Sequence, residues 1–185
     1  MLCCCPFSAG GYFSEGLYLN HIIIGNAIFL VGSLMMVAIG VVRGKQRILV
    51  AQCVQFTIMG IGQLVLGGIT GTITNVVSVL RNIICVRVKF TLAYKLLFMA
   101  IQVGLTLLVM PSSVVEWFPT FAACLYTWYL DTKSEKVLKI VMIACQLLWV
   151  SFDLSIQNYV GAVFDVFTIV STIVGILMLK KERKQ

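Results

Sequence analysis

Charged side chains are scarce in this sequence of 185 residues. Asp, Glu, Lys and Arg make up 11% of the chain, and only 7 residues are acidic. Soluble globular domains contain about a quarter charged residues. Hydrophobic residues make up 60% of the chain, and the mean hydropathy is +1.01. The composition therefore excludes an ordinary soluble domain and predicts an all-α protein that crosses a membrane several times.

Residues suited to catalysis and cofactor binding are also missing. The single histidine, His21, lies at the edge of an apolar stretch, so neither a Ser-His pair nor an HExxH zinc motif can form. Glycine-rich nucleotide loops are absent, and Asp153 and Asp165 lack the glycine-rich setting of intramembrane aspartyl proteases. We therefore expect no enzymatic activity, no metal ion and no cofactor. The formal charge of +7 comes from short cationic clusters between apolar runs, which argues against a nucleic-acid partner.

The amino-terminal segment MLCCCPFSAGGYFSEG has no basic region followed by an apolar one, so we expect no cleavable signal peptide. Its three adjacent cysteines, Cys3, Cys4 and Cys5, cannot easily pair internally, because neighbouring Cα atoms lie about 3.8 Å apart and a disulfide needs about 4.4 Å or more. An uncommitted tail is the simplest interpretation, and acylation or intermolecular pairing is the alternative. The other four cysteines lie in apolar segments, where they act as small hydrophobic side chains.

Seven apolar stretches are long enough to cross a bilayer. A hydrocarbon core about 30 Å thick needs about 20 helical residues. Glycine, proline and charge clusters separate the stretches, as at VVRGKQR, LGGITG, MPSS and DTKSEK. The predicted spans are 21–42, 48–66, 69–88, 91–110, 112–130, 137–157 and 159–179.

The cationic residues predict the direction of the chain. Thirteen of the fourteen Lys and Arg residues fall in alternate connections or at the carboxyl end, which places them all on one side of the membrane. The opposite side has none. We therefore expect the amino terminus outside and the carboxyl terminus in the cytoplasm. The fourteenth cation, Arg81, lies inside the third span.

Shifting the sequence against itself by 90 positions superposes spans one to three on spans five to seven, which predicts an internal repeat. Gly71 then matches Gly161, and Asn75 matches Asp165. Three helices that start outside finish inside, so a single fourth helix returns the chain and both triplets share one orientation. This is a parallel 3+1+3 repeat. The expected organisation is an extracytoplasmic tail at 1–20, a first three-helix bundle at 21–88, a linker helix at 89–110, a second three-helix bundle at 111–180 and a basic cytoplasmic tail at 181–185.

This helix order resembles the SWEET and PQ-loop (MtN3-like) superfamily. Within it, the segments SVLRNIIC, FPTFAACLYTW and YVGAVFDVFTIVSTIVGI are similar to the YgjV family of bacterial inner-membrane proteins. The resemblance covers the chain from about residue 22 and implies a multi-pass protein of the bacterial inner membrane. It also implies a proline hinge in the first helix of each triplet. Pro119 offers one such mid-helix hinge, whereas Phe29 occupies the matching position in the first span.

Polar residues follow helical spacing along one face of the third and seventh spans, at Gly71, Asn75, Ser78, Asn82 and Cys85 and at Gly161, Asp165, Thr168, Thr172 and Gly175. Helix packing alone could explain both faces, because small and polar residues collect where membrane helices touch. In SWEET-like carriers, a Trp on the second helix and an Asn on the third enclose a sugar. The resemblance implies such a role for Trp149 with Asp165 and for Met59 with Asn75, each pair being 16 positions apart. Simple packing of Trp149 is the alternative.

The heights of the polar residues in the membrane suggest a common site. Asp153 and Asp165 lie at similar heights, and two acids in a partly dry cavity suit a proton or cation site. A solvated loop edge is the alternative for Asp153. Arg81 lies about 9 Å deeper than Asn75 and either lines an inner vestibule or joins helices through backbone carbonyls. The expected substrate-binding residues are Met59, Gln63, Asn75, Arg81, Cys145, Trp149, Asp153 and Asp165.

These patterns predict a membrane transporter that binds a small solute, a sugar or a small cationic metabolite, and exposes it alternately to the two sides. The competing hypothesis is a non-transporting membrane protein, such as a receptor, an accessory subunit or a scaffold, in which the polar faces only hold helices together. The lipid bilayer is the expected partner in both cases. The oligomeric state stays open, with a homo-oligomer as one alternative.

Overall fold

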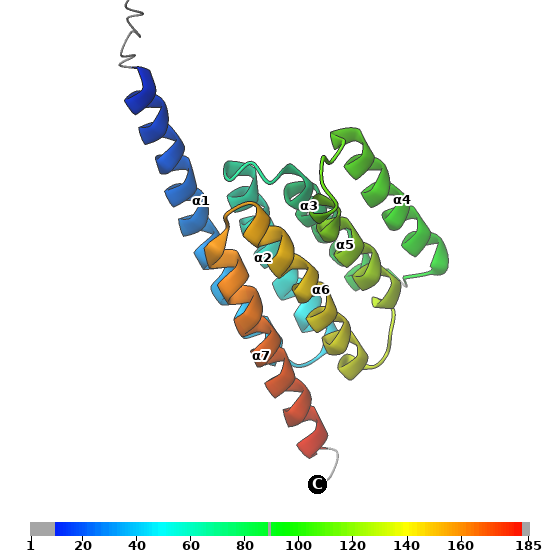
Figure 1. The fold of residues 1–185 in the computed structure, drawn as a ribbon. Coiled ribbons are helices and arrows are strands. Elements are labelled where there is room, and N and C mark those ends of the chain that lie inside the picture. The colour runs from blue at the N-terminus through cyan, green and yellow to red at the C-terminus, as the bar shows by residue number, and fades with distance from the viewer. Residues whose placement is uncertain (1–9, 89, 183–185) are drawn as a thin grey trace, which may run out of the picture.

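The computed structural model describes residues 10–88 and 90–182, and this part of the chain is all-helical (Figure 1). Six of its helices are long and apolar enough to cross a membrane, as expected for a polytopic membrane protein. The three cysteines Cys3, Cys4 and Cys5 lie outside the described residues. The elements are α1 (Gly10–Val41), α2 (Lys45–Val65), α3 (Ile69–Arg87), α4 (Leu92–Val109), the 3₁₀ helix η1 (Val115–Trp117), α5 (Phe118–Tyr129), α6 (Glu135–Ser155) and α7 (Tyr159–Glu182).

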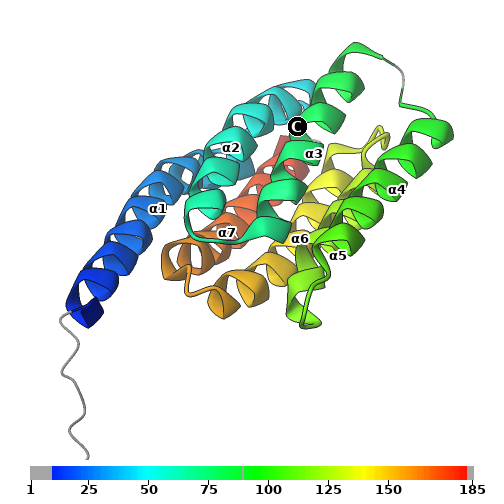
Figure 2. The same ribbon diagram turned by 90° about the horizontal axis from the view of Figure 1, so that it is seen from above.

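The helices are arranged as two rows that close into a ring. The first row is α1, α2 and α3, and the second is α5, α6 and α7, with neighbours along the chain packed side by side in each (Figure 2). The rows meet where α1 contacts α7 and where α3 contacts α5. Helix α4 packs against α3 and α5 at one end of the rows. The interior enclosed by the ring is where the candidate site lies.

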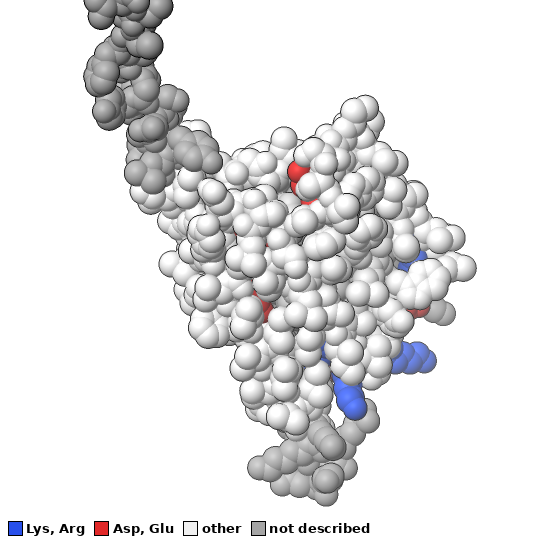
Figure 3. Space-filling model, in the orientation of Figure 1, with Lys and Arg blue, Asp and Glu red and all other residues white. Residues whose placement is uncertain are grey.

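The distribution of side chains is the reverse of that in a soluble protein. Large apolar residues such as Leu64, Val76, Leu147 and Leu177 are exposed, whereas Gln, Asn and Thr side chains fill much of the interior. Figure 3 shows a face that is largely uncharged, with most of its visible Lys and Arg side chains toward the lower end. This pattern is expected when the helices are surrounded by lipid hydrocarbon, because hydrocarbon forms no hydrogen bonds.

The turn between α2 and α3 and the turn between α6 and α7 are built alike. In the first, the N–H groups of Leu66, Gly67 and Gly68 donate to the carbonyl groups of Gly62, Leu64 and Gln63; in the second, those of Ile156, Gln157 and Asn158 donate to Phe152, Leu154 and Asp153. Each donor and each acceptor in the first turn corresponds to the residue 90 positions later in the second turn. The middle residue has a positive φ in both, 79° at Gly67 and 58° at Gln157. Helices α2 and α6, and likewise α3 and α7, also begin 90 residues apart.

The connection before α5 differs from the prediction. The expected span at 112–130 is replaced by η1 and by α5, which has only 12 residues. Pro119 lies in the first turn of α5, so the expectation that it lies in the middle of a helix is wrong. Proline is tolerated in a first turn because the N–H groups there have no intrahelical acceptor. Helix α1 also differs, since it begins at Gly10 and not near residue 21.

Helices α1 and α7 pack closely at one end of the ring. The Ser171 hydroxyl donates to the Val37 carbonyl oxygen at 2.9 Å, and Gly40 and Gly175 allow the backbones to approach. Lys139, which the sequence assigned to a loop, is buried in α6 and donates to the carbonyl oxygens of Gly40 at 2.7 Å and Val42 at 3.1 Å. These carbonyl groups end α1 and lack intrahelical donors, so the lysine caps the helix.

We predict that Gly175→Ala lowers the apparent melting temperature of the purified protein. A Cβ at this position would lie 2.5 Å from the Gly40 carbonyl oxygen, so the helices must separate, at a cost of about 1 to 3 kcal/mol. Gly104→Ala on α4 is the matched control, because no atom lies within 4 Å of its added Cβ. The control should be neutral or slightly stabilising. Equal melting temperatures for the two variants would contradict the close packing of α1 on α7.

Candidate functional site: a polar cavity inside the helix ring

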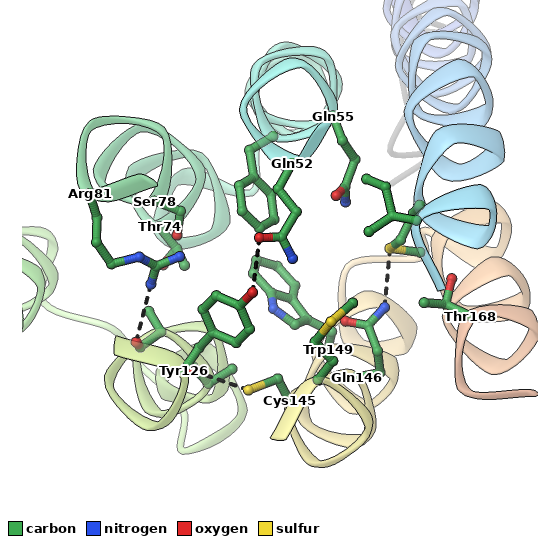
Figure 4. A pocket seen from close by; sticks show the side chains of 16 residues that line it. Gln52, Gln55, Thr74, Ser78, Arg81, Tyr126, Cys145, Gln146, Trp149 and Thr168 are labelled. Carbon is green, nitrogen blue, oxygen red and sulfur yellow. Dashed lines mark hydrogen bonds between the residues drawn. The ribbon is translucent and has the colours of Figure 1, made fainter. Parts of the chain in front are cut away.

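A cavity lined by many polar side chains lies between the two rows of helices and has two adjoining compartments, of which Figure 4 shows the one that contains Arg81. The Arg81 compartment encloses about 50 Å³ and is lined by Gln52, Ser78, Arg81, Tyr126 and Cys145 among others. The Asp165 compartment encloses about 20 Å³ and is lined by Met59, Gln63, Asn75, Asp153 and Asp165. Both are bordered by Met36, Gln55, Phe56, Gln146 and Trp149. A water molecule needs roughly 10 to 15 Å³ of such space, so the cavity has room for a few water molecules.

All eight residues predicted to bind substrate line this cavity. Arg81 and Cys145 border the first compartment, and Trp149 borders both. The remaining five residues line the second compartment, as given above. The Cys145 thiol donates to the carbonyl oxygen of Ala122 at 3.3 Å, and the Trp149 ring meets Phe152 edge to face at 5.7 Å. The sequence pattern therefore identified residues that the fold brings together, while their role as substrate ligands stays a prediction.

Arg81 is buried at one end of the cavity and has only neutral partners among the described residues. Its Nε and Nη2 groups donate to Asn82 Oδ1 at 3.2 and 3.1 Å, and Nη1 donates to Thr127 Oγ1 at 2.9 Å and to the Ala123 carbonyl oxygen at 3.4 Å. The guanidinium also lies over the Tyr126 ring, 4.9 Å from its centre. Arg81 thus lines the cavity and also joins α3 to α5, which combines both alternatives raised by the sequence.

A second network continues from Arg81 across the cavity wall. Asn82 donates to Gln52 Oε1 at 3.2 Å. The Tyr126 hydroxyl donates to the same oxygen at 3.0 Å (Figure 4). Gln52 on α2 therefore connects α3 with α5. This network leaves Gln52, Asn82 and Tyr126 with defined partners, so the wall of the Arg81 compartment is fixed by packing within the protein.

The Asp165 compartment has fewer internal partners. Asn75 Nδ2 donates to Gln63 Oε1 at 3.0 Å, and Gln146 Nε2 donates to Asp165 Oδ1 at 3.0 Å. Among the described residues, Gln63 Nε2, Asp165 Oδ2 and both carboxyl oxygens of Asp153 make no hydrogen bond of regular geometry. The alternative that Asp153 is a solvated loop residue is wrong, because its side chain is 1% exposed. Buried polar atoms without partners are costly, so this compartment is suited to an additional ligand.

Gln146 and Tyr126 are among the lining residues that the sequence analysis missed. Gln146 bonds to Asp165 and also donates to the sulfur atom of Met36 at 3.1 Å. Its position, seven residues before Asp153 on α6, repeats the helical spacing of the polar face and could have predicted it. Tyr126 had no comparable signal, because its neighbours on α5 are mostly apolar and its partner Gln52 is distant in sequence.

The fold and the cavity define a polytopic helical membrane protein whose ring of helices encloses buried polar side chains. The model of the family Imp-YgjV, bacterial inner membrane protein, matches residues 23–183. Because this match covers most of the chain, the protein belongs to this family of bacterial inner-membrane proteins. No curated protein and no solved structure matches the chain.

We predict that Arg81→Lys destabilises the protein although the charge is kept. A lysine cannot reproduce the planar fork that reaches Asn82 and Thr127 together, and the expected loss is about 1 to 3 kcal/mol. Arg87→Lys, at the exposed end of the same helix, is the control and should change little. Thermal unfolding in detergent measures the difference. Retention of the wild-type melting temperature by Arg81→Lys would contradict the role of the guanidinium.

Proposed function

We propose that the protein is a carrier for small polar solutes, a sugar or a small cationic metabolite, which works by alternating access. The observation that supports this most directly is the cavity itself, because polar side chains from both rows of helices converge on it. In a membrane, ionisable side chains that face an internal cavity mark solute or ion pathways more often than packing positions. No catalytic step, metal or cofactor is part of the proposal.

A parallel 3+1+3 repeat is part of this proposal. It is supported by the matching hydrogen bonds of the two turns and by the helix starts that recur after 90 residues. The contacts between the rows have the same relation, since the contact of α3 with α5 corresponds to that of α7 with α1. A SWEET-like carrier would then expose its central site by moving one triplet relative to the other around it.

Contacts between the rows lie at both ends of the cavity. At one end, the Gly44 N–H donates to the Glu135 carboxylate at 3.1 Å, and Lys45 Nζ donates to the Thr132 carbonyl oxygen at 3.3 Å. At the other end, Gly68 lies against the side chain of Ile156. This arrangement supports an occluded state in which a solute enters only after one set of contacts breaks. The small volume of the cavity agrees with this, because a sugar would require the rows to separate.

We predict that Trp149→Ala reduces solute uptake at least tenfold in proteoliposomes, because Trp149 borders both compartments. Radiolabelled glucose, sucrose, choline and putrescine serve as probes. Leu147→Ala on the lipid-facing side of the same helix is the control, and its uptake should equal that of the wild type. If none of the four probes enters faster than into protein-free vesicles, the assignment of the carrier to these solute classes is overturned.

A non-transporting role is the second candidate, and the closed network around Arg81 favours it. That network ties α2, α3 and α5 together without leaving a free acceptor for a solute. In a receptor, accessory subunit or scaffold, the polar interior would serve only to hold the helices together. In that case Trp149→Ala would alter the yield of folded protein, and no vesicle assay would detect solute movement.

We predict an external amino terminus and a cytoplasmic carboxyl terminus. Exposed Arg43 and Lys133 lie in the α1–α2 and α5–α6 connections, which share one end of the ring. Exposed Arg47 and Lys136 lie in the first turns of α2 and α6 at the same end, and such cations remain on the cytoplasmic side. A green fluorescent protein fused to the carboxyl terminus should fluoresce in cells, while an alkaline phosphatase fusion at the same point should be inactive. An active phosphatase fusion would reverse the proposed orientation.

A further inference from the structure

The first half of the chain contains a complete hydrogen-bonded pair at the end of the cavity. Asn75 Nδ2 on α3 donates to Gln63 Oε1 on α2 at 3.0 Å, and both side chains are buried. The Gln63 side chain occupies the space beside Gly71, where a Cβ atom would collide with it. One amide hydrogen thus joins the two helices at this height.

The second half has two acids at the equivalent places. Asp153 lies 90 positions after Gln63, and Asp165 lies 90 positions after Asn75. The turns beside both pairs share the same backbone hydrogen bonds. The Asp153 carboxyl group lies beside Gly161, as Gln63 lies beside Gly71. Asp153 is also close enough to Asp165 for the two charges to interact. The second pair therefore occupies the equivalent places in the fold, with carboxyl groups where the first pair has amides.

No cation among the described residues lines this compartment. Asp165 Oδ1 accepts from Gln146, but in the described part of the chain Asp165 Oδ2 and both oxygens of Asp153 accept no hydrogen bond of regular geometry. The lining residues from α1, α2, α3 and α6 are neutral, apart from Asp153 itself, and Asp165 is the lining residue from α7. The Asn158 amide lies beside the Asp153 carboxyl group and interacts with it, but it is a neutral neighbour of one acid and does not remove the repulsion between the two. Arg81 borders the other compartment and has neutral partners of its own.

Two ionised carboxylates in this position would repel each other and could only accept hydrogen bonds. Burying such charges without compensation is costly, whereas a proton on one carboxyl group removes the repulsion and supplies a donor for the other. The proton would then take the place of the amide hydrogen of Asn75. This is a reversible binding step, in which a carboxylate and a proton give a carboxylic acid.

We propose that Asp153 and Asp165 share one proton and form a proton-binding site in the second half of the cavity. The inference deepens the proposed function, because a bound proton would give the carrier a coupling ion. Its direct test requires no solute and no transport. A failure of proton binding and a failure of the carrier hypothesis can therefore be told apart.

Infrared spectroscopy of the purified protein in nanodiscs tests the site at pH 7. The wild type should show the stretching band of a protonated carboxyl group, with an isotope shift in deuterated water. Asp165→Asn and Asp153→Asn should each lose this band, because the new amide donates to the remaining carboxylate. Glu116→Gln, in a loop outside the cavity, is the control and should keep it. Absence of the band from the wild type, or its persistence in both single variants, would overturn the proposal.

The double variant Asp153→Gln with Asp165→Asn provides a second measurement. It copies the natural pair of Gln63 and Asn75, so it should fold and show no carboxyl band. In the wild type, the folded protein holds a proton that the unfolded chain releases at neutral pH, so stability should fall as pH rises. For one proton, the unfolding equilibrium constant should change by at most about tenfold per pH unit. The double variant should lose that slope, and equal slopes would contradict the shared proton.

Discussion

The arrangement of this protein depends on the inability of lipid to form hydrogen bonds. Polar side chains on the spanning helices must find partners inside the protein, and they do so both across helices and along them. Gln102 on α4 donates to Thr74 at 2.8 Å and to Thr120 at 3.3 Å, which fixes α4 against α3 and α5. Lys139 and Arg81 act similarly at other heights. The charge of Arg81 is tolerated because several neutral acceptors and an aromatic ring surround it.

The two halves share a backbone plan but not a chemistry. Their turns match bond for bond after 90 residues, whereas the side chains that face the cavity differ. Met59 faces the cavity from the first half and Trp149 from the second, and an amide pair stands opposite a carboxyl pair. The position of Arg81 corresponds to Ser171, which bonds to α1. Two turns with matching backbone hydrogen bonds thus accompany a cavity whose sides differ in chemistry, with the cation and the acids in separate compartments.

Much of this arrangement could be predicted from the sequence, because long apolar runs and helical spacing of polar residues depend on local patterns. The starts of α3 and α7, the offset of 90 residues and the grouping of Asn75 with Asp165 follow from such patterns. The short α5 could not be predicted, since its apolar composition resembles that of a full span. Lys139 was misplaced for a related reason: a cation near a helix end suggests a loop, and only the tertiary contact with Gly40 makes its burial favourable.

The distribution of unpaired polar atoms separates a binding site from simple helix packing. Native proteins pair about 90% or more of their buried polar groups, and a purely structural interior should do so evenly. Nine buried side-chain atoms lack partners among the described residues, and four of them belong to Gln63, Asp153 and Asp165. By contrast, the guanidinium of Arg81 and the amide of Asn82 are bonded. The missing partners therefore concentrate where the acids lie, and a proton or a ligand at that place would complete the interior.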